Sequence, residues 1–175
     1  MSNHSATTHE PKGNSLARTF DDDRYAWTRV ARTRRRSVVA EAGLLTALCV
    51  LTVMAAFADG GLATWHVVVW TVGLLAFVPL HSMLNTGIRG LYDRSGRTLD
   101  EHQNRLRERS HAAVRWPANA LTLAACTSAV GVVAATDDTE YGLALGFLLW
   151  FAASLLPYWH LGWTLADEAE SPELP

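Results

Sequence analysis

Four long apolar stretches limit what this chain can fold into more than any other feature does. They cover residues 37–58, 62–88, 117–135 and 141–163 and contain almost no charged side chain. Each has about the ~20 apolar residues that a helix needs to cross a hydrocarbon layer of ~30 Å. We expect helices there because lipid offers no hydrogen-bond partner to the backbone. The sequence therefore predicts an all-α integral membrane protein, a four-helix bundle made of two antiparallel hairpins.

The basic residues indicate how these helices are oriented. All 15 Lys and Arg residues lie either before residue 37 or between residues 89 and 115, so the two short loops between hairpin helices carry only acid. Short basic segments stay on the cytoplasmic side of a membrane protein. We therefore expect a multi-pass protein of the cell (inner) membrane, with both termini and the central loop in the cytoplasm.

The chain divides into a tail, a basic segment, a membrane domain and a second tail. Residues 1–20 are polar and lack periodicity, which predicts a disordered cytoplasmic tail. Residues 21–36 begin with three acids and then mix aromatic residues with arginines, which favours a basic juxtamembrane helix lying on anionic lipid. The four-span membrane domain covers residues 37–163, and residues 164–175 form an acidic cytoplasmic tail.

A charged segment, residues 98–115, separates the two hairpins. Thr98 followed by Glu101 is a capping-box pattern, which predicts that a cytoplasmic helix begins at Thr98. Glu101 and Arg105 form a favourable i,i+4 pair on that helix. The helix should lead into the third span, with Pro117 at a bend.

The two hairpins resemble one another. Pro79 and His81 near the end of the second span correspond to Pro157 and His160 near the end of the fourth. Parallel repeats of this kind occur in transporters. Either the chain contains a duplication, or two Ala/Leu-rich hairpins are alike because both obey the same charge rule.

The fourth span contains Gly142 and Gly146 in the sequence GLALG. Small residues four positions apart let two membrane helices approach closely. We therefore expect the fourth helix to pack tightly on a neighbour through these glycines.

Several function classes lack their sequence signature. There is no phosphate-binding glycine loop, metal-spaced Cys/His cluster, zinc-protease motif or nucleophile elbow. Cys49 and Cys126 fall inside spans and are expected to pack as small apolar residues. The net charge of −2 points to no particular soluble partner. We expect no enzyme, no catalytic residue, no metal, no cofactor and no nucleic-acid partner.

Glu41 is the ionisable residue that lies within the first span, one turn from its basic side. Such residues are functional candidates. In a small transporter Glu41 could exchange a proton against a cationic substrate. Alternatively, Glu41 pairs with one of the nearby arginines, Arg34, Arg35 and Arg36, or with Arg115, at the membrane interface.

His81 and His160 lie near the same side of the membrane on two different helices. Two imidazoles in a four-helix bundle can ligate one haem iron, as in a b-type electron carrier. His66 is about 22 Å from His81 along its helix and has no partner high on the fourth span, so at most one haem is expected.

The stretch LDEHQNRLRERSHAAV, residues 99–114, resembles a motif of small bacterial membrane proteins of uncharacterised function. These have Asp-Glu-Arg and then Leu-Arg-x-Arg just before a span, and here His102 replaces the arginine. The resemblance implies a four-helix membrane protein and assigns no catalytic residue.

Our leading hypothesis is an accessory or regulatory factor that acts by protein contact in or at the membrane. The contact surface for a membrane or cytoplasmic partner, or for anionic lipid, would be formed by arginines of both basic segments: Arg34, Arg35, Arg36, Arg105 and Arg109. A homo-oligomer is a further possibility. The proton-coupled transporter and the haem carrier are the alternatives.

Overall fold

The computed structural model describes residues 23–58, 62–94 and 99–167. A 3-10 helix, η1 (Asp23–Arg29), is followed by four long helices: α2 (Ala31–Ala56), α3 (Leu62–Gly87), α4 (Glu101–Thr136) and α5 (Thr139–Thr164). All four are long and apolar enough to cross a membrane, and the described residues contain no strand. The prediction of four membrane-length helices is confirmed.

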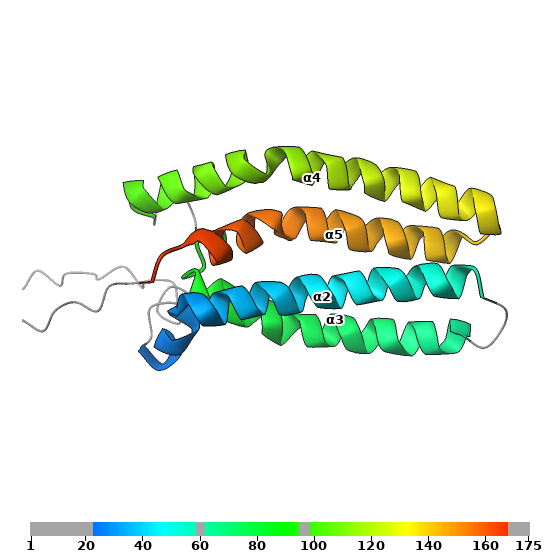
Figure 1. Cartoon of the computed structure of the whole chain (residues 1–175), viewed down its shortest axis with the longest axis horizontal. Helices are drawn as coiled ribbons and strands as arrows, with labels where there is room; N and C mark the ends of the chain where they lie inside the picture. Colours follow the sequence, from blue (N-terminus) through cyan, green and yellow to red (C-terminus); the bar gives the residue numbers. More distant parts are fainter. Residues whose placement is uncertain (1–22, 59–61, 95–98, 168–175) are drawn as a thin grey trace, which may run out of the picture.

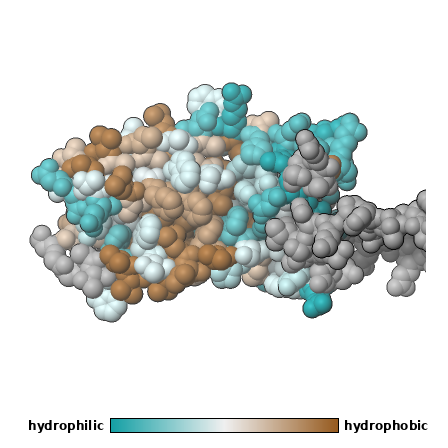
Figure 2. Space-filling view, turned by 180° about the vertical axis from the view of Figure 1, so that it is seen from behind, coloured by the Kyte–Doolittle hydropathy of each residue, from teal (hydrophilic) through white to brown (hydrophobic). Residues whose placement is uncertain are grey.

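The four helices lie side by side in the order α4, α5, α2, α3, and each runs opposite to the one before it in the chain (Figure 1). The most extensive contact is between α4 and α5, and α2 contacts both α3 and α5. We call the end where α2 and α4 begin the basic end, and the end where α3 and α5 begin the acidic end. Hydrophobic residues cover the surface between the ends, and hydrophilic residues gather toward them (Figure 2).

The basic segment before the first span is not one helix over residues 21–36. Val30 has an extended conformation and separates η1 from α2. Thr28 is buried, and its carbonyl oxygen approaches α3 so closely that a Cβ on Gly87 would lie 2.6 Å from it. The predicted single helix is wrong because η1 turns aside to pack on α3, and the arginines from 32 onward belong to α2 itself.

The charged segment and the third span form one helix, α4, which continues through Pro117. Its N-cap is Asp100, whose side chain accepts from the Gln103 amide at 2.7 Å, while the Gln103 side chain accepts from the Asp100 amide at 3.2 Å. The predicted start at Thr98 is wrong because Asp100 and Gln103 form this capping box instead. Thr98 itself lies outside the described residues, as do residues 1–20 and most of the predicted acidic tail. The expected Glu101–Arg105 ion pair is present.

The GLALG sequence brings α5 close to α4, as predicted. A Cβ on Gly142 would lie 2.5 Å from the Val133 side chain and 2.8 Å from the Ala129 carbonyl oxygen. A Cβ on Gly146 would lie 3.0 Å from the Ala129 Cβ. Side chains at these positions would therefore hold the two helices apart.

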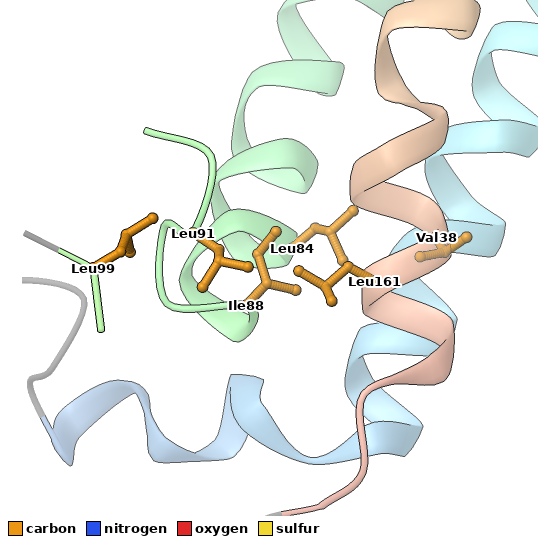
Figure 3. Close-up of a cluster of buried hydrophobic side chains, with 6 residues drawn as sticks. All are labelled: Val38, Leu84, Ile88, Leu91, Leu99 and Leu161. Atoms are coloured by element: carbon orange, nitrogen blue, oxygen red, sulfur yellow. The ribbon is translucent and has the colours of Figure 1, made fainter. Parts of the chain in front are cut away.

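Two apolar clusters fill the interior. The first, the basic-end cluster, contains residues of α2, α3, α5 and the segment between α3 and α4: Val38, Leu84, Ile88, Leu91, Leu99 and Leu161. Figure 3 shows Leu84, Ile88, Leu91 and Leu161 gathered together, with Leu99 and Val38 on either side of them. The second, the central cluster, lies between α2, α3 and α5: Leu45, Leu48, Phe77, Leu148, Ala152 and Leu155.

Candidate functional site

Glu41 lies on the buried face of α2. Its successors on that face, Leu45, Leu48 and Thr52, follow at intervals of four, three and four residues, which place them on one side of a helix. Glu41 has an exposed fraction of 0%. The carboxylate is therefore enclosed in protein and does not reach the lipid or water around the molecule.

Two side chains from other helices meet the Glu41 carboxylate. The Trp159 indole Nε1, on α5, donates to Oε2 at 2.8 Å. His81 Nδ1, on α3, lies 3.6 Å from the same oxygen. Oε1 of Glu41 and Nδ1 of His81 have no hydrogen-bond partner within the described chain. The site thus combines an acid, an imidazole and an indole from three helices.

No arginine lies within ion-pair distance of Glu41 among the described residues. The alternative in which Glu41 pairs with Arg34, Arg35, Arg36 or Arg115 is therefore wrong. Arg35, Arg36 and Arg115 are exposed, whereas Glu41 is buried with Leu45. Arg34 is also buried, but its guanidinium donates to the carbonyls of Leu165 and Ala166.

Apolar clusters close the site on both sides along the helix axes. One turn toward the basic end are Val38 and Leu84, which belong to the basic-end cluster. One turn toward the centre are Leu45 and Phe77, which belong to the central cluster. An ionised carboxylate without full hydrogen bonding is costly in such surroundings. The cost is removed when the carboxylate binds a proton or a cation.

His81 links the site to the basic end. Its ring stacks on Phe77 with centroids 5.4 Å apart, lies 5.0 Å from the Tyr158 ring and is 26% exposed. The Tyr158 hydroxyl is 3.5 Å from Asp93 Oδ1, and the Asn85 amide donates to the other oxygen of Asp93. Polar groups therefore lead from the enclosed carboxylate to the exposed Asp93.

His160 belongs to a different set of contacts. Its Nδ1 lies 3.1 Å from the Ser110 hydroxyl on α4. Tyr158, which contacts His81, is two positions earlier on α5, and two positions correspond to about 200° around a helix. His81 and His160 thus face different neighbours, so the structure does not bring together the two imidazoles that a shared haem would need.

The Pro157 carbonyl gathers polar side chains near the basic end. It accepts from the Ser110 hydroxyl at 2.9 Å and from the Tyr92 hydroxyl at 3.2 Å. Burial raises the pKa of Tyr92, and the hydrogen bond to Ser110 and the positive charge of Arg107 oppose that rise. Tyr92 is therefore held in its protonated, hydrogen-bond-donating form.

A second polar cluster lies near the acidic end of the same three helices. His66 on α3 is 7% exposed, and its Nε2 lies 3.1 Å from the hydroxyl of Thr52 on α2. The Tyr141 ring on α5 lies edge-on to His66, with centroids 5.1 Å apart. The central cluster separates this Thr52–His66–Tyr141 group from Glu41 by 11 positions of α2, or about 16 Å.

The arginines expected at a contact surface do not share one environment. Arg34 is buried at 2% exposure and donates to the Leu165 and Ala166 carbonyls at the end of α5, so it connects α2 to the end of α5. Arg35 is exposed, with its guanidinium 5.5 Å from the centroid of Trp163. Arg36, Arg105 and Arg109 are exposed.

The sequence pattern alone does not single out Trp159 and Thr52 as members of polar clusters. Trp159 lies near a span end, where tryptophan is usual at the headgroup level. Their depth in the membrane could have indicated the first cluster. Glu41, His81 and Trp159 all lie one to two turns from the basic side of their predicted spans.

No family model, curated protein sequence or solved structure matches the chain. The resemblance of residues 99–114 to uncharacterised membrane proteins stays a prediction. Function is therefore argued from the geometry of the two polar clusters.

Proposed function

We propose that the protein is a small proton-coupled transporter in which Glu41 binds a proton and exchanges it against a cationic substrate. The observation that carries this proposal is a carboxylate with an exposed fraction of 0%, no arginine partner, and one oxygen without a hydrogen bond. Ionisable groups in such a position are retained mainly for function, because they are costly to the fold.

A purely structural ion pair with His81 explains the site less well. Two buried charges repay their desolvation only when their geometry is excellent and their remaining polar atoms are hydrogen-bonded. Here Nδ1 and Oε2 are 3.6 Å apart, and Oε1 of Glu41 lacks a partner. An added proton on the carboxyl group would remove the cost of this unsatisfied oxygen.

His81 has a definite role in this proposal. His81 Nδ1 lies 3.6 Å from the Glu41 carboxylate, and the His81 ring contacts Tyr158, whose hydroxyl lies 3.5 Å from Asp93. When a cation takes the place of the proton on Glu41, the released proton passes by way of His81 toward these residues of the basic end. The imidazole thereby connects the enclosed acid to the exposed residues.

In the membrane, we place the two hairpins as a four-helix bundle of the inner membrane with the basic end in the cytoplasm. This follows from the positive-inside rule and the confinement of Lys and Arg to that end. Protons would then pass between Glu41 and the cytoplasm through His81.

The test uses the full chain in liposomes that contain a pH-sensitive dye. A gradient of a small ammonium cation, or of sodium or potassium, should drive proton movement, and Glu41→Gln should reduce the rate to the level of empty liposomes. The matched control is Glu101→Gln, which removes an exposed carboxylate at the same end and should transport like the wild type.

A second measurement is independent of the substrate. Infrared difference spectra between acid and alkaline pH should contain a protonated-carboxyl band that Glu41→Gln removes and Glu101→Gln retains. An unchanged band in Glu41→Gln, together with unchanged proton flux, would contradict the proposal.

A contact function remains our second proposal, favoured by the surface of α4. This helix packs chiefly on α5, and its Arg105 and Arg109 side chains are exposed. Reversing both charges should remove a co-purifying membrane or cytoplasmic protein, whereas Asp137→Asn, at the acidic end, should retain it. Purification in mild detergent without any stoichiometric partner would count against this function.

A further inference from the structure

A cavity of about 240 Å³ lies at the acidic end, beside the Thr52–His66–Tyr141 group. Its lining includes His66 and Trp70 from α3, and Glu140 and Tyr141 from α5. We propose that this cavity binds a small protonated organic amine. The binding site goes beyond the proposed function of Glu41, and only its use as a transport substrate site rests on that function.

The hydrogen bond between Thr52 and His66 fixes which imidazole nitrogen carries the proton. The Thr52 hydroxyl donates its single hydrogen to the Leu48 carbonyl at 2.8 Å. It must therefore accept from His66 Nε2, which lies 3.1 Å away. In a neutral imidazole Nδ1 is then an acceptor, and it makes no hydrogen bond within the described chain. An ammonium N–H group is the donor that suits it.

Two aromatic rings and a carboxylate complete a site for a cation. Trp70 and Tyr141 line the cavity, and aromatic faces attract ammonium groups. Glu140 supplies a negative charge on the same cavity wall. This combination favours an organic cation over an inorganic anion or a neutral molecule.

The start of α5 does not oppose a positive ligand. Asp138 caps the helix, accepting from the Glu140 amide at 2.8 Å and from the Tyr141 amide at 3.3 Å. The Glu140 side chain is therefore free of that capping role. Furthermore, the sequence has no Lys or Arg between residues 37 and 88 or after residue 115, so no basic side chain of the acidic end competes with the ligand.

The size and donor set of the cavity favour a small organic ligand. Cavities for drug-sized molecules are typically about 300–1,000 Å³, so this one suits a smaller amine. The described residues contain no group of three or more His, Cys, Asp or Glu side chains that could hold a metal ion. One carboxylate and one imidazole beside two aromatic rings match an ammonium better.

The test is calorimetric titration of the full chain in lipid nanodiscs with benzylammonium chloride. Benzyl alcohol serves as the neutral probe and benzoate as the anionic one. We expect saturable binding of benzylammonium alone. Glu140→Gln should weaken it by roughly tenfold, as should Tyr141→Leu, while Tyr141→Phe keeps the ring and should bind like the wild type.

The matched control is Asp137→Asn, which removes another acid of the same end outside the cavity lining. Asn tolerates the left-handed conformation of residue 137, φ 57°, so the turn should persist. Equal weakening by Asp137→Asn and Glu140→Gln would overturn the site, as would equal binding of benzyl alcohol.

Glu41→Gln separates this inference from the proposed function. That variant should bind benzylammonium normally while it no longer moves protons. Binding without proton flux in the wild type would sustain the site and refute the transporter, whereas proton flux without binding at the acidic end would do the reverse.

Discussion

At each end of the interior between α2, α3 and α5, one polar or aromatic side chain from each helix meets the other two, but the residue types differ. Near the basic end, an acid of α2 meets an imidazole of α3 and an indole of α5: Glu41, His81 and Trp159. Near the acidic end, a hydroxyl of α2 meets an imidazole of α3 and a phenol ring of α5: Thr52, His66 and Tyr141. The central cluster separates them.

The two clusters differ in how completely the α2 side chain is hydrogen-bonded. The Thr52 hydroxyl has both a donor partner and an acceptor partner, so it is fully hydrogen-bonded without any charge. The Glu41 carboxylate carries a potential charge and an oxygen without a partner. Burial of a neutral hydroxyl is inexpensive once it is hydrogen-bonded, whereas burial of a carboxylate is not. The Glu41 carboxylate therefore costs the fold more than the Thr52–His66 pair does.

Removing each histidine tests this difference most strongly. His81→Leu leaves Glu41 facing an apolar side chain, and we expect a loss of about 3–5 kcal/mol in the free energy of unfolding. His66→Leu leaves the Thr52–Leu48 hydrogen bond intact, so we expect a loss of about 1 kcal/mol. Unfolding in mixed micelles at neutral pH measures both. Equal losses would show that Glu41 carries no special cost.

Replacing the aromatic members should give a smaller contrast. Trp159→Phe removes the donor to Glu41, a hydrogen bond to a charged group worth about 1.5–3 kcal/mol. Tyr141→Phe retains the ring that contacts His66 and should change stability by less than about 0.5 kcal/mol. The same unfolding assay applies. A larger loss in Tyr141→Phe than in Trp159→Phe would reverse our ranking of the two clusters.

The outer helix α4 contributes to neither cluster, and its packing can be weakened separately. Gly142→Ala forces a methyl group to within 2.8 Å of the Ala129 carbonyl, and we expect a loss of about 1–3 kcal/mol. Gly131→Ala is the control, because a Cβ there has nothing within 4 Å and Ala is the better helix former. Thermal unfolding of both variants checks this, and proton flux in folded Gly142→Ala should stay at the wild-type level.

Alkaline pH should produce the smallest effect, which we test at Tyr92. Because burial raises the pKa of Tyr92, the folded protein holds this proton more tightly than the unfolded chain does. The resulting stabilisation is present below the unfolded pKa of about 10 and is lost as the pH rises through the folded pKa. Tyr92→Phe should lose less stability than the wild type between neutral and strongly alkaline pH. Identical pH profiles would contradict this.

Features that depend only on the residues of a single helix could be predicted from the sequence. The four membrane-length helices and the close approach at Gly142 and Gly146 follow from apolar length and small-residue spacing. The choice of Glu41 as a candidate followed from its position within the first span. Its partners did not, because they depend on how α3 and α5 are rotated about their own axes, which only interhelical packing determines.

The residues at which α2 and α4 begin could not be predicted from the sequence pattern either. Thr98 and Asp100 are both suitable N-cap residues for α4. Asp100 is the N-cap because it and Gln103 form two reciprocal hydrogen bonds. Likewise, the residues before α2 have a composition that suits a helix, but the contact of Thr28 with α3 at Gly87 turns them aside.

The meeting of Arg34 with the end of α5 has a consequence for how the protein is made. The first amide of α2, at Ala31, donates a hydrogen bond to the Asp167 carboxylate. The Arg34 guanidinium donates to the carbonyls of Leu165 and Ala166. These partners emerge from the ribosome more than 130 residues after Ala31. The N-terminus of α2 therefore lacks these hydrogen-bond partners until α5 has been synthesised. These hydrogen bonds can form only after the last helix has packed against the first.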